Sequence, residues 1–250
     1  MAGHSKWSNI KRKKEKEDAG RGRIFTKIAR QITIAAREGG GGDPTSNFRL
    51  RLAIDAARAV NMPNENIQRA IKRGTGELES VNYEEIVYEG YGPAGVAILM
   101  DIATDNRNRT AGEIRFIMSK YGGNLGESGC VAWMFEKKGV LLVTGESLPS
   151  EDDVLLMALE AGAEDVVTTH EGYEIICAPE DFPQVNEQLQ NILPLQQAEL
   201  TMRPKNNTVL GYDDAQRVIA LIEMLEDNDD VQAVYTNMEL TAETIAALQA

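Results

Sequence analysis

Apolar side chains recur at helical spacing through the first 75 residues of the chain. In residues 21–38, successive steps of about 100° bring the apolar side chains into one arc of about 120°. The members of this arc are Ile24, Phe25, Ile28, Ile32, Ala35 and Ala36. The glycines at 39–42, followed by Pro44, predict the end of this helix.

Three more helices are predicted around it: a polar, basic one at 8–18, and others at 46–60 and 64–73. Pro63 favours the start of the helix at 64–73, and Gly74 favours its end. The pattern therefore predicts a small helical bundle. In the helix at 46–60 we expect the buried face to consist of Phe48, Leu52, Ala56 and Val60.

After about residue 77 the pattern alternates between strands and helices. Strands are predicted at 85–89, 96–103 and 131–136, with a helix at 110–121. Residues 140–202 then predict strand, helix, two strands, helix and strand, which is the β-α-β-β-α-β order of ferredoxin-like folds. A second unit, begun at 96, would be completed by a strand at 206–211, a helix at 213–225 and a strand at 231–236.

These elements predict an α+β multidomain protein. We expect an N-terminal helical bundle followed by two ferredoxin-like α+β domains, one inserted in the other. The expected boundaries are 1–80 for the basic helical domain, 81–138 plus 206–240 for the discontinuous middle domain, and 139–205 for the inserted domain. Deletion of the inserted segment is expected to leave the rest folded.

Composition narrows the class of protein. The chain has 250 residues, of which 42% are hydrophobic, so it can bury a core. Its apolar runs are too short to span a membrane, and its first residues lack the apolar core of a signal peptide, so we expect a cytoplasmic location. Cys130 and Cys177 lie in apolar, strand-like sequence, which favours buried, unreactive thiols.

Charge is distributed unevenly along the chain, whose net charge is −13. Residues 1–80 contain 17 Lys and Arg against 9 Asp and Glu, a net of +8, whereas residues 81–250 contain 9 against 30, a net of −21. Because salt at cellular levels screens charge beyond roughly 8 Å, a distant acidic region does not cancel a local basic surface. Such an asymmetry is typical of proteins that contact nucleic acid.

Candidate nucleic-acid-binding residues fall into two groups in the basic domain. The cluster at 11–16 projects on all sides of a helix, which suits a solvated helix or arm along a phosphate backbone. On 21–38 a basic stripe of four residues, Arg23, Lys27, Arg30 and Arg37, lies opposite the apolar arc, and Arg51 and Arg58 extend it. The candidates are Lys6, Trp7, Lys11, Arg12, Lys13, Lys14, Lys16, Arg23, Lys27, Arg30 and Arg37.

Two alternatives remain open for these residues. The basic surface serves solubility alone, or it contacts nucleic acid; Trp7 packs into the bundle, or it stacks on a base. If Lys27 and Arg30 face solvent, replacing both should weaken nucleic-acid binding while changing stability by less than about 0.5 kcal/mol per site.

Several motifs that suggest catalysis or metal binding lack the context they need. Residues 90–95 have the spacing of a dinucleotide fingerprint, but a predicted strand follows where a helix is required, so a tight turn is favoured. Residues 227–230 lack the remaining oxygen ligand and the glycine of a calcium loop, and we interpret them as an acidic helix-to-strand turn with solvated carboxylates. His4, His170 and the two thiols have no zinc spacing. We therefore expect no metal, no cofactor and no enzymatic activity.

Arg107 and Arg109 follow a predicted strand and begin a predicted helix. A helix N-terminus favours anions, so two arginines there are candidates for contact with an anion or with a partner's carboxylate. The alternative is structural: the Asn and Thr residues of 105–110 suit helix capping, and the arginines form an internal ion pair.

Several segments closely resemble the YebC/PmpR family, whose members are described as probable transcriptional regulatory proteins. The matching segments are MAGHSKW at 1–7, FTK at 25–27, YEGYGP at 88–93, DNRNRT at 105–110, GGNLG at 122–126 and DVQ at 230–232. The resemblance spans nearly the whole chain and keeps the order of the motifs. It implies three domains in a cytoplasmic bacterial protein that binds DNA. No catalytic site is established in the family, so none is carried over.

The resemblance also implies an alternative target, because a mitochondrial branch resembles a translational activator and bacterial members are linked to ribosomes stalled on proline-rich sequences. We therefore expect a nucleic-acid-binding regulator of gene expression, with DNA as the first target and ribosomal RNA as the alternative. Phosphate contacts look alike on either polymer, and no standard base-reading motif separates them. A third hypothesis is an interaction protein whose acidic domains dock a basic partner.

Overall fold

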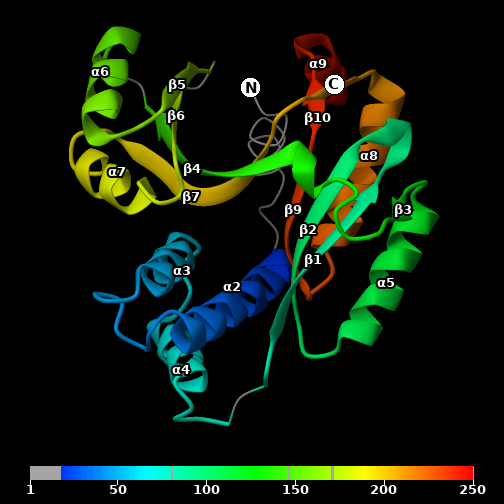
Figure 1. Ribbon diagram of the computed structural model, residues 1–250, viewed down its shortest axis with the longest axis horizontal. Helices are drawn as coiled ribbons and strands as arrows, with labels where there is room; N and C mark the ends of the chain where they lie inside the picture. Colours follow the sequence, from blue (N-terminus) through cyan, green and yellow to red (C-terminus); the bar gives the residue numbers. More distant parts are fainter. Residues whose placement is uncertain (1–17, 80, 146, 170–171, 250) are drawn as a thin grey trace. The chain divides into compact units, whose positions relative to one another are not determined.

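A computed structural model describes residues 18–79, 81–145, 147–169 and 172–249 of the chain. It has α-helices, two four-stranded antiparallel sheets and a two-stranded parallel sheet, as expected for an α+β protein (Figure 1). The chain divides into two compact units: residues 134–206 form one, and the described residues before 134 and after 206 form the other. No helix in the described part of the chain is long and apolar enough to cross a membrane.

Three helices form the N-terminal bundle: α2 (Asp18–Glu38), α3 (Phe48–Ala59) and α4 (Asn64–Gly74), with α3 and α4 both packed on α2 (Figure 1). The predicted apolar arc of α2 is confirmed as the core, since four of its members are buried and Ile24 and Phe25 pack against them. Helix α4 approaches α2 closely, because a Cβ added at Gly74 would lie 2.4 Å from the carbonyl oxygen of Thr33.

The prediction for the buried face of α3 is wrong. The structure buries Leu50, Ala53, Ile54 and Ala57. Of the four predicted residues, Ala56 is exposed, Phe48 and Leu52 are half-buried, and Val60 is half-buried against the core. Both sets of residues have helical spacing, so local pattern does not choose between them. Asn47 fixes the rotation: its side chain accepts the N–H of Leu50 at 3.0 Å and donates to the carbonyl of Ala35, on α2, at 2.8 Å.

The second part of this unit is built on a four-stranded antiparallel sheet in the order β3-β1-β2-β9. Its strands are β1 (Glu84–Tyr91), β2 (Ala97–Thr104), β3 (Asn124–Leu125) and β9 (Val231–Thr236). Helices α5 (Arg107–Lys120) and α8 (Tyr212–Glu226) share one core with side chains from β2 and β9. Strands β8 (Thr208–Leu210) and β10 (Met238–Leu240) pair in parallel, and α9 (Ala242–Gln249) follows.

From β2 onward this part runs β2, α5, β3, β8, α8 and β9, which is the predicted β-α-β-β-α-β order, but its strand pairing departs from a ferredoxin-like sheet because β8 pairs with β10 and β1 lies beside β2. It begins with a β1–β2 hairpin, and the strand predicted at 131–136 is instead the turn η2 (Ala132–Met134) followed by a strand of the other unit. The physical reason is Glu89, a buried carboxylate that accepts the backbone N–H groups of Gly129, Val131 and Ala132 at 2.6, 2.8 and 2.7 Å. Those donors are therefore not available to a strand ladder.

The unit at 134–206 has the order β4 (Phe135–Thr144), α6 (Glu151–Ala161), β5 (Asp165–Thr168), β6 (Gly172–Cys177), α7 (Phe182–Leu189) and β7 (Leu195–Pro204). Its sheet runs β5-β6-β4-β7 and is antiparallel throughout. This is the β-α-β-β-α-β order read from the sequence. The first strand begins at Phe135 rather than at 140, because its pairing with β7 already starts at Phe135, which faces Pro204.

The two thiols differ in their surroundings. Cys177 is buried, and burial raises the pKa of its thiol to about 11. Cys130 is only half-buried, although burial raises the pKa of its thiol too. Both are free cysteines, so the expectation of full burial holds for Cys177 alone.

Candidate nucleic-acid interface

The basic cluster lies outside the described residues. This applies to Lys6, Trp7, Lys11, Arg12, Lys13, Lys14 and Lys16, so their role stays a prediction from the sequence. The basic stripe on α2 is described, and each of its four members can be placed.

Arg30 is the most enclosed member of the stripe, with a side chain only 10% exposed. Its guanidinium donates to the Asp230 carboxylate at 2.8 Å and to the carbonyl of Asp229 at 3.0 Å. It also donates to the carbonyl of Ala103 and stacks 4.7 Å from the ring centroid of Tyr83. The expectation that this residue faces solvent is wrong, because the sheet and the acidic turn of the same unit enclose it.

Asp230 is the centre of this contact, and sequence reasoning missed it by treating the turn at 227–230 as solvated. Its carboxylate is 5% exposed and receives hydrogen bonds from Thr110 at 2.6 Å, Arg109 at 2.7 Å and Thr104 at 3.0 Å besides that of Arg30. Burial alone would raise the pKa of this carboxyl, but the four donors outweigh burial and lower it to about 2. Asp230 is therefore an ionised anchor for arginines from two helices.

The other members of the stripe also face their own chain. Arg23 forms an ion pair with Asp227 at 2.6 Å, in which both side chains remain about half exposed. Lys27 donates to the carbonyl of Glu226, near the end of α8. Arg37 donates to the carbonyl of Tyr83 at 2.7 Å and to the side chain of Asn82. The stripe is thus a contact surface inside the unit, and neutralising Lys27 and Arg30 would disturb the fold as well as any binding.

Arg107 and Arg109 separate into different roles. Asn106 caps α5 by accepting the backbone N–H of Arg109 at 3.1 Å, and the side chain of Arg109 pairs with Asp105 at 2.8 Å and with Asp230. These carboxylates raise the pKa of the Arg109 guanidinium. Arg107 is exposed, and within the described residues its side chain forms no ion pair. The structural alternative therefore describes Arg109, while Arg107 remains accessible.

Exposed cations lie on the other two helices of the bundle. Arg51 and Arg58 on α3 are exposed, and Arg58 pairs weakly with Asp55 at 3.3 Å. On α4, Lys72 and Arg73 are exposed and form no ion pair with other described residues, whereas Arg69 pairs with Glu65 at 2.7 Å. Sequence reasoning missed this surface. Positions 69, 72 and 73 have i, i+3, i+4 spacing and so share one helix face, and this spacing was the signal that could have identified it.

The motifs that suggested other chemistry take structural roles. The glycine-rich segment at 90–95 ends β1 and forms the short turn η1 (Pro93–Gly95) before β2, as the turn interpretation predicted. Among the described residues, no three His, Cys, Asp or Glu side chains gather into a group that could hold a metal ion.

Comparisons with known proteins place this geometry in a family. The model described as the TACO1/YebC protein N-terminal domain matches residues 5–77, and the model described as the TACO1/YebC second and third domain matches residues 83–238. A probable transcriptional regulatory protein of Syntrophomonas wolfei is 55% identical, over 99% of this chain and 100% of its own length. Another from Pelotomaculum thermopropionicum is 56% identical, over 96% and 99%.

A solved structure is also similar. The crystal structure of a conserved hypothetical protein from Aquifex aeolicus superposes with a TM-score of 0.80, at 46% identity, and the match covers 90% of this chain and 92% of that one. The family models together span most of the sequence, and the relatives match it almost from end to end. The chain therefore belongs to the TACO1/YebC family.

Proposed function

We propose that this protein is a non-catalytic regulator of gene expression that works in the cytoplasm and binds nucleic acid, with DNA as its target, through its basic N-terminal domain. The observation that carries the proposal is the charge distribution, +8 over residues 1–80 against −21 over residues 81–250. The relatives' description as probable transcriptional regulatory proteins supports the regulatory role.

The phosphate contacts come from two surfaces of the N-terminal domain. One is the basic cluster, to which Lys6, Trp7, Lys11, Arg12, Lys13, Lys14 and Lys16 belong. The other is the exposed face of α4 with Lys72 and Arg73, which have no competing carboxylate among the described residues. On α2, Arg23 and Arg37 keep part of their surface exposed and add to the contact. Lys27 and Arg30 position the bundle, Lys27 through the carbonyl of Glu226 and Arg30 through Asp229 and Asp230.

The experiment compares matched double variants in which two cations become neutral. Lys13→Gln/Lys14→Gln tests the basic cluster, and Lys72→Gln/Arg73→Gln tests α4. The control is Lys137→Gln/Lys205→Gln, which neutralises two exposed lysines of the unit at 134–206. Affinity for duplex DNA is measured by fluorescence anisotropy across a salt series. Each released phosphate contact should lower the log–log salt slope by roughly 0.9.

We expect each test variant to lower the slope by up to roughly 2, nearly equally for unrelated DNA sequences, and the control to bind like the wild type. Binding of purified ribosomes by the same variants identifies the polymer. Loss on ribosomes with DNA binding intact would contradict the choice of DNA. If all three variants behave alike on both targets, the basic domain is a solvated surface and the proposal fails.

A protein partner is proposed for the unit at 134–206, which is acidic. Helix α6 packs on its sheet through Val154, Ala158 and Ala161, which are buried. Its leucines are exposed instead: Leu156 by 59%, Leu159 by 50% and Leu155 by 36%. A helix that buries its small residues and exposes its leucines is typical of a contact surface. Because residues 134–206 hold 14 acidic and 4 basic residues, the complementary partner is a basic amphipathic helix.

This contact can be measured with model peptides. A helical peptide with one lysine face and one leucine face should bind the wild type and lose affinity for Leu156→Gln/Leu159→Gln, while a scrambled peptide of the same composition should bind neither well. Equal binding of both peptides would mean that charge alone attracts them, and the leucine face would then have no partner of this kind.

A further inference from the structure

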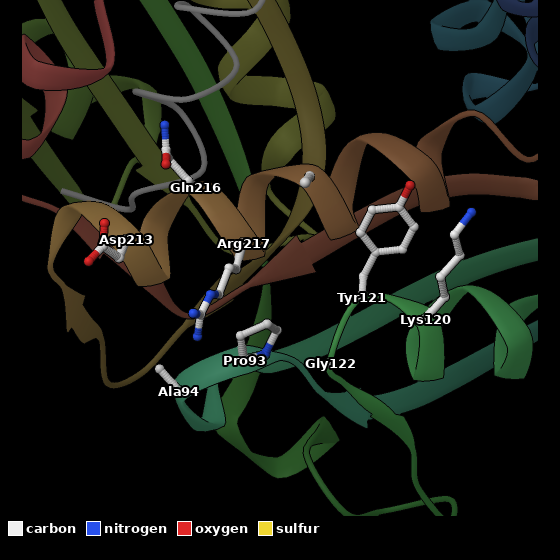
Figure 2. Close-up of a pocket in the computed structure, with 9 residues that line it drawn as sticks. Pro93, Ala94, Lys120, Tyr121, Gly122, Asp213, Gln216 and Arg217 are labelled. Atoms are coloured by element: carbon white, nitrogen blue, oxygen red, sulfur yellow. The ribbon is translucent and has the colours of Figure 1, made fainter.

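An open groove with a volume of about 820 Å³ lies between helix α8 and the turns at one end of the sheet β3-β1-β2-β9, in the unit formed by the described residues before 134 and after 206. Pro93 and Ala94 of the β1–β2 turn form one wall, and α8 forms the other (Figure 2). The groove is lined by Pro93, Ala94, Lys120, Tyr121, Gly122, Asp213, Gln216, Arg217 and Ala220. None of these residues belongs to the basic domain.

The charge of the groove is opposite to that of its surroundings. Residues 81–133 and 207–250 together contain 16 Asp and Glu but only five Lys and Arg. One of the five, Arg109, is held by Asp230 and Asp105. Two of the remaining four, Lys120 and Arg217, line the groove, where Asp213 is the one acidic lining residue. The groove is therefore a local cationic site in an acidic domain.

Lys120 is held in place by rings rather than by a carboxylate. Its Nζ lies 5.6 Å from the ring centroid of Tyr121 and 5.9 Å from that of Phe116, and it forms no ion pair with other described residues. Cation–π contacts fix a cation without neutralising its charge. Arg217 is 71% exposed, and its contact with Asp214 is long, at 3.8 Å, so this pair binds it only weakly. Both cations are available to an anionic ligand.

Phe116 supplies an aromatic surface next to this site. It precedes Lys120 by one turn of α5, and the residue is 66% exposed. On the exposed face of α5 its neighbours are Gly112, Glu113, Arg115 and Ser119, and the Glu113 carboxylate accepts a hydrogen bond from the side chain of Asn228 at 2.8 Å. A cation beside an open ring is the combination with which proteins hold single-stranded nucleic acid, since the phosphate meets the charge and a base stacks on the ring.

We propose that this groove is a second nucleic-acid contact, in which Lys120 and Arg217 bind backbone phosphates of a single strand and Phe116 stacks on an adjacent base. The inference rests on the proposed function, because it extends the same ligand from the basic domain to the sheet-containing domain. It predicts that a single strand, rather than only duplex, is part of the natural target.

The experiment uses the full chain and a labelled single-stranded oligonucleotide, as DNA and as RNA. Lys120→Gln/Arg217→Gln should lower the log–log salt slope by roughly 1.4, since each phosphate on a single strand contributes roughly 0.7. Phe116→Ala should weaken binding about tenfold with an unchanged slope, and Phe116→Tyr should restore it. Lys137→Gln/Lys205→Gln is the control for net charge, and thermal unfolding confirms that each variant is folded.

Photocrosslinking gives a readout that does not depend on affinity. An oligonucleotide carrying 5-iodouracil should crosslink to the peptide that contains Phe116 and Tyr121 in the wild type, and not in Lys120→Gln/Arg217→Gln.

If this variant binds and crosslinks like the wild type while Lys13→Gln/Lys14→Gln is weakened, the groove inference is overturned and the proposed function stands. If neither variant is weakened, both fall. If polyglutamate displaces the oligonucleotide from the groove as well as competing DNA does, the occupant is an acidic peptide and the inference is overturned.

Discussion

Helices α2 and α6 are both amphipathic, but they use their polar and apolar faces in opposite ways. On α2 the apolar arc is the core and the basic face also meets its own chain, through Arg30 and Asp230. On α6 the buried face holds only small side chains, and the large apolar side chains of Leu156 and Leu159 face solvent. Amphipathic spacing therefore identifies a helix and its two faces, but it does not identify what each face contacts.

The difference has an energetic meaning. A cation enclosed with its carboxylate supports the fold, because removing one partner leaves the other buried without compensation. An exposed leucine contributes little to the fold, because its surface is in water in the folded chain as in the unfolded one. Substitutions at Arg30 and Asp230 should therefore cost far more stability than substitutions at Leu156 and Leu159.

Arg30→Ala should lower the free energy of unfolding by about 3 kcal/mol, since Asp230 then stays buried with fewer donors. Arg23→Ala, which breaks the exposed pair with Asp227 on the same face, should change it by less than about 0.5 kcal/mol. Urea denaturation of both variants measures the difference. Equal effects would mean that Arg30 is as solvated as Arg23, and the contrast with α6 would disappear.

Stability should fall in acid through Asp230. Its pKa is lowered from 3.8 to about 2 in the folded chain, so its contribution is complete above pH 4 and is lost as the pH falls towards 2. The shift corresponds to about 2 kcal/mol. Asp230→Asn should be less stable at neutral pH and should lack this part of the acid dependence. Urea midpoints measured between pH 5 and 2 check this, and parallel curves for the two proteins would contradict it.

The smallest effects are expected on the exposed face of α6. Leu156→Gln and Leu159→Gln should each change the free energy of unfolding by less than about 0.5 kcal/mol. Val154→Ala, on the buried face of the same helix, should cost about 1 kcal/mol or more, because it leaves a cavity. If the leucine variants cost as much as Val154→Ala, the leucines pack in solution and offer no contact surface.

Local pattern predicted the elements well because their causes are local. Strand β9 begins and ends where the sequence indicated, and helix α8 does so within one residue at each end, since caps, turns and periodicity lie within a few residues of each boundary. The short elements β3, β10 and α9 were missed. Two or three paired residues give too little pattern to detect a strand.

The candidate site was harder to predict because its contacts are distant in sequence. Arg30 and Asp230 lie 200 positions apart, and nothing in either segment identifies the other. Glu89 likewise binds the loop at 129–132, about 40 positions away, so that a turn forms where the sequence predicted a strand at 131–136. The groove cations come from α5 and α8, which the sequence placed on separate elements without bringing them together.

Strands β4 and β7, by which the chain enters and leaves the unit at 134–206, end side by side. The N–H of Lys205 donates to the carbonyl of Met134 at 2.8 Å, and Phe135 faces Pro204 in the ladder. Paired residues of antiparallel strands have Cα atoms only about 5 Å apart, so the surrounding polypeptide meets a gap that one or two residues bridge. In evolution, the segment at 134–206 can therefore be lengthened, shortened or replaced by recombination, and its exposed surface can change, without breaking the strands of the sheet β3-β1-β2-β9.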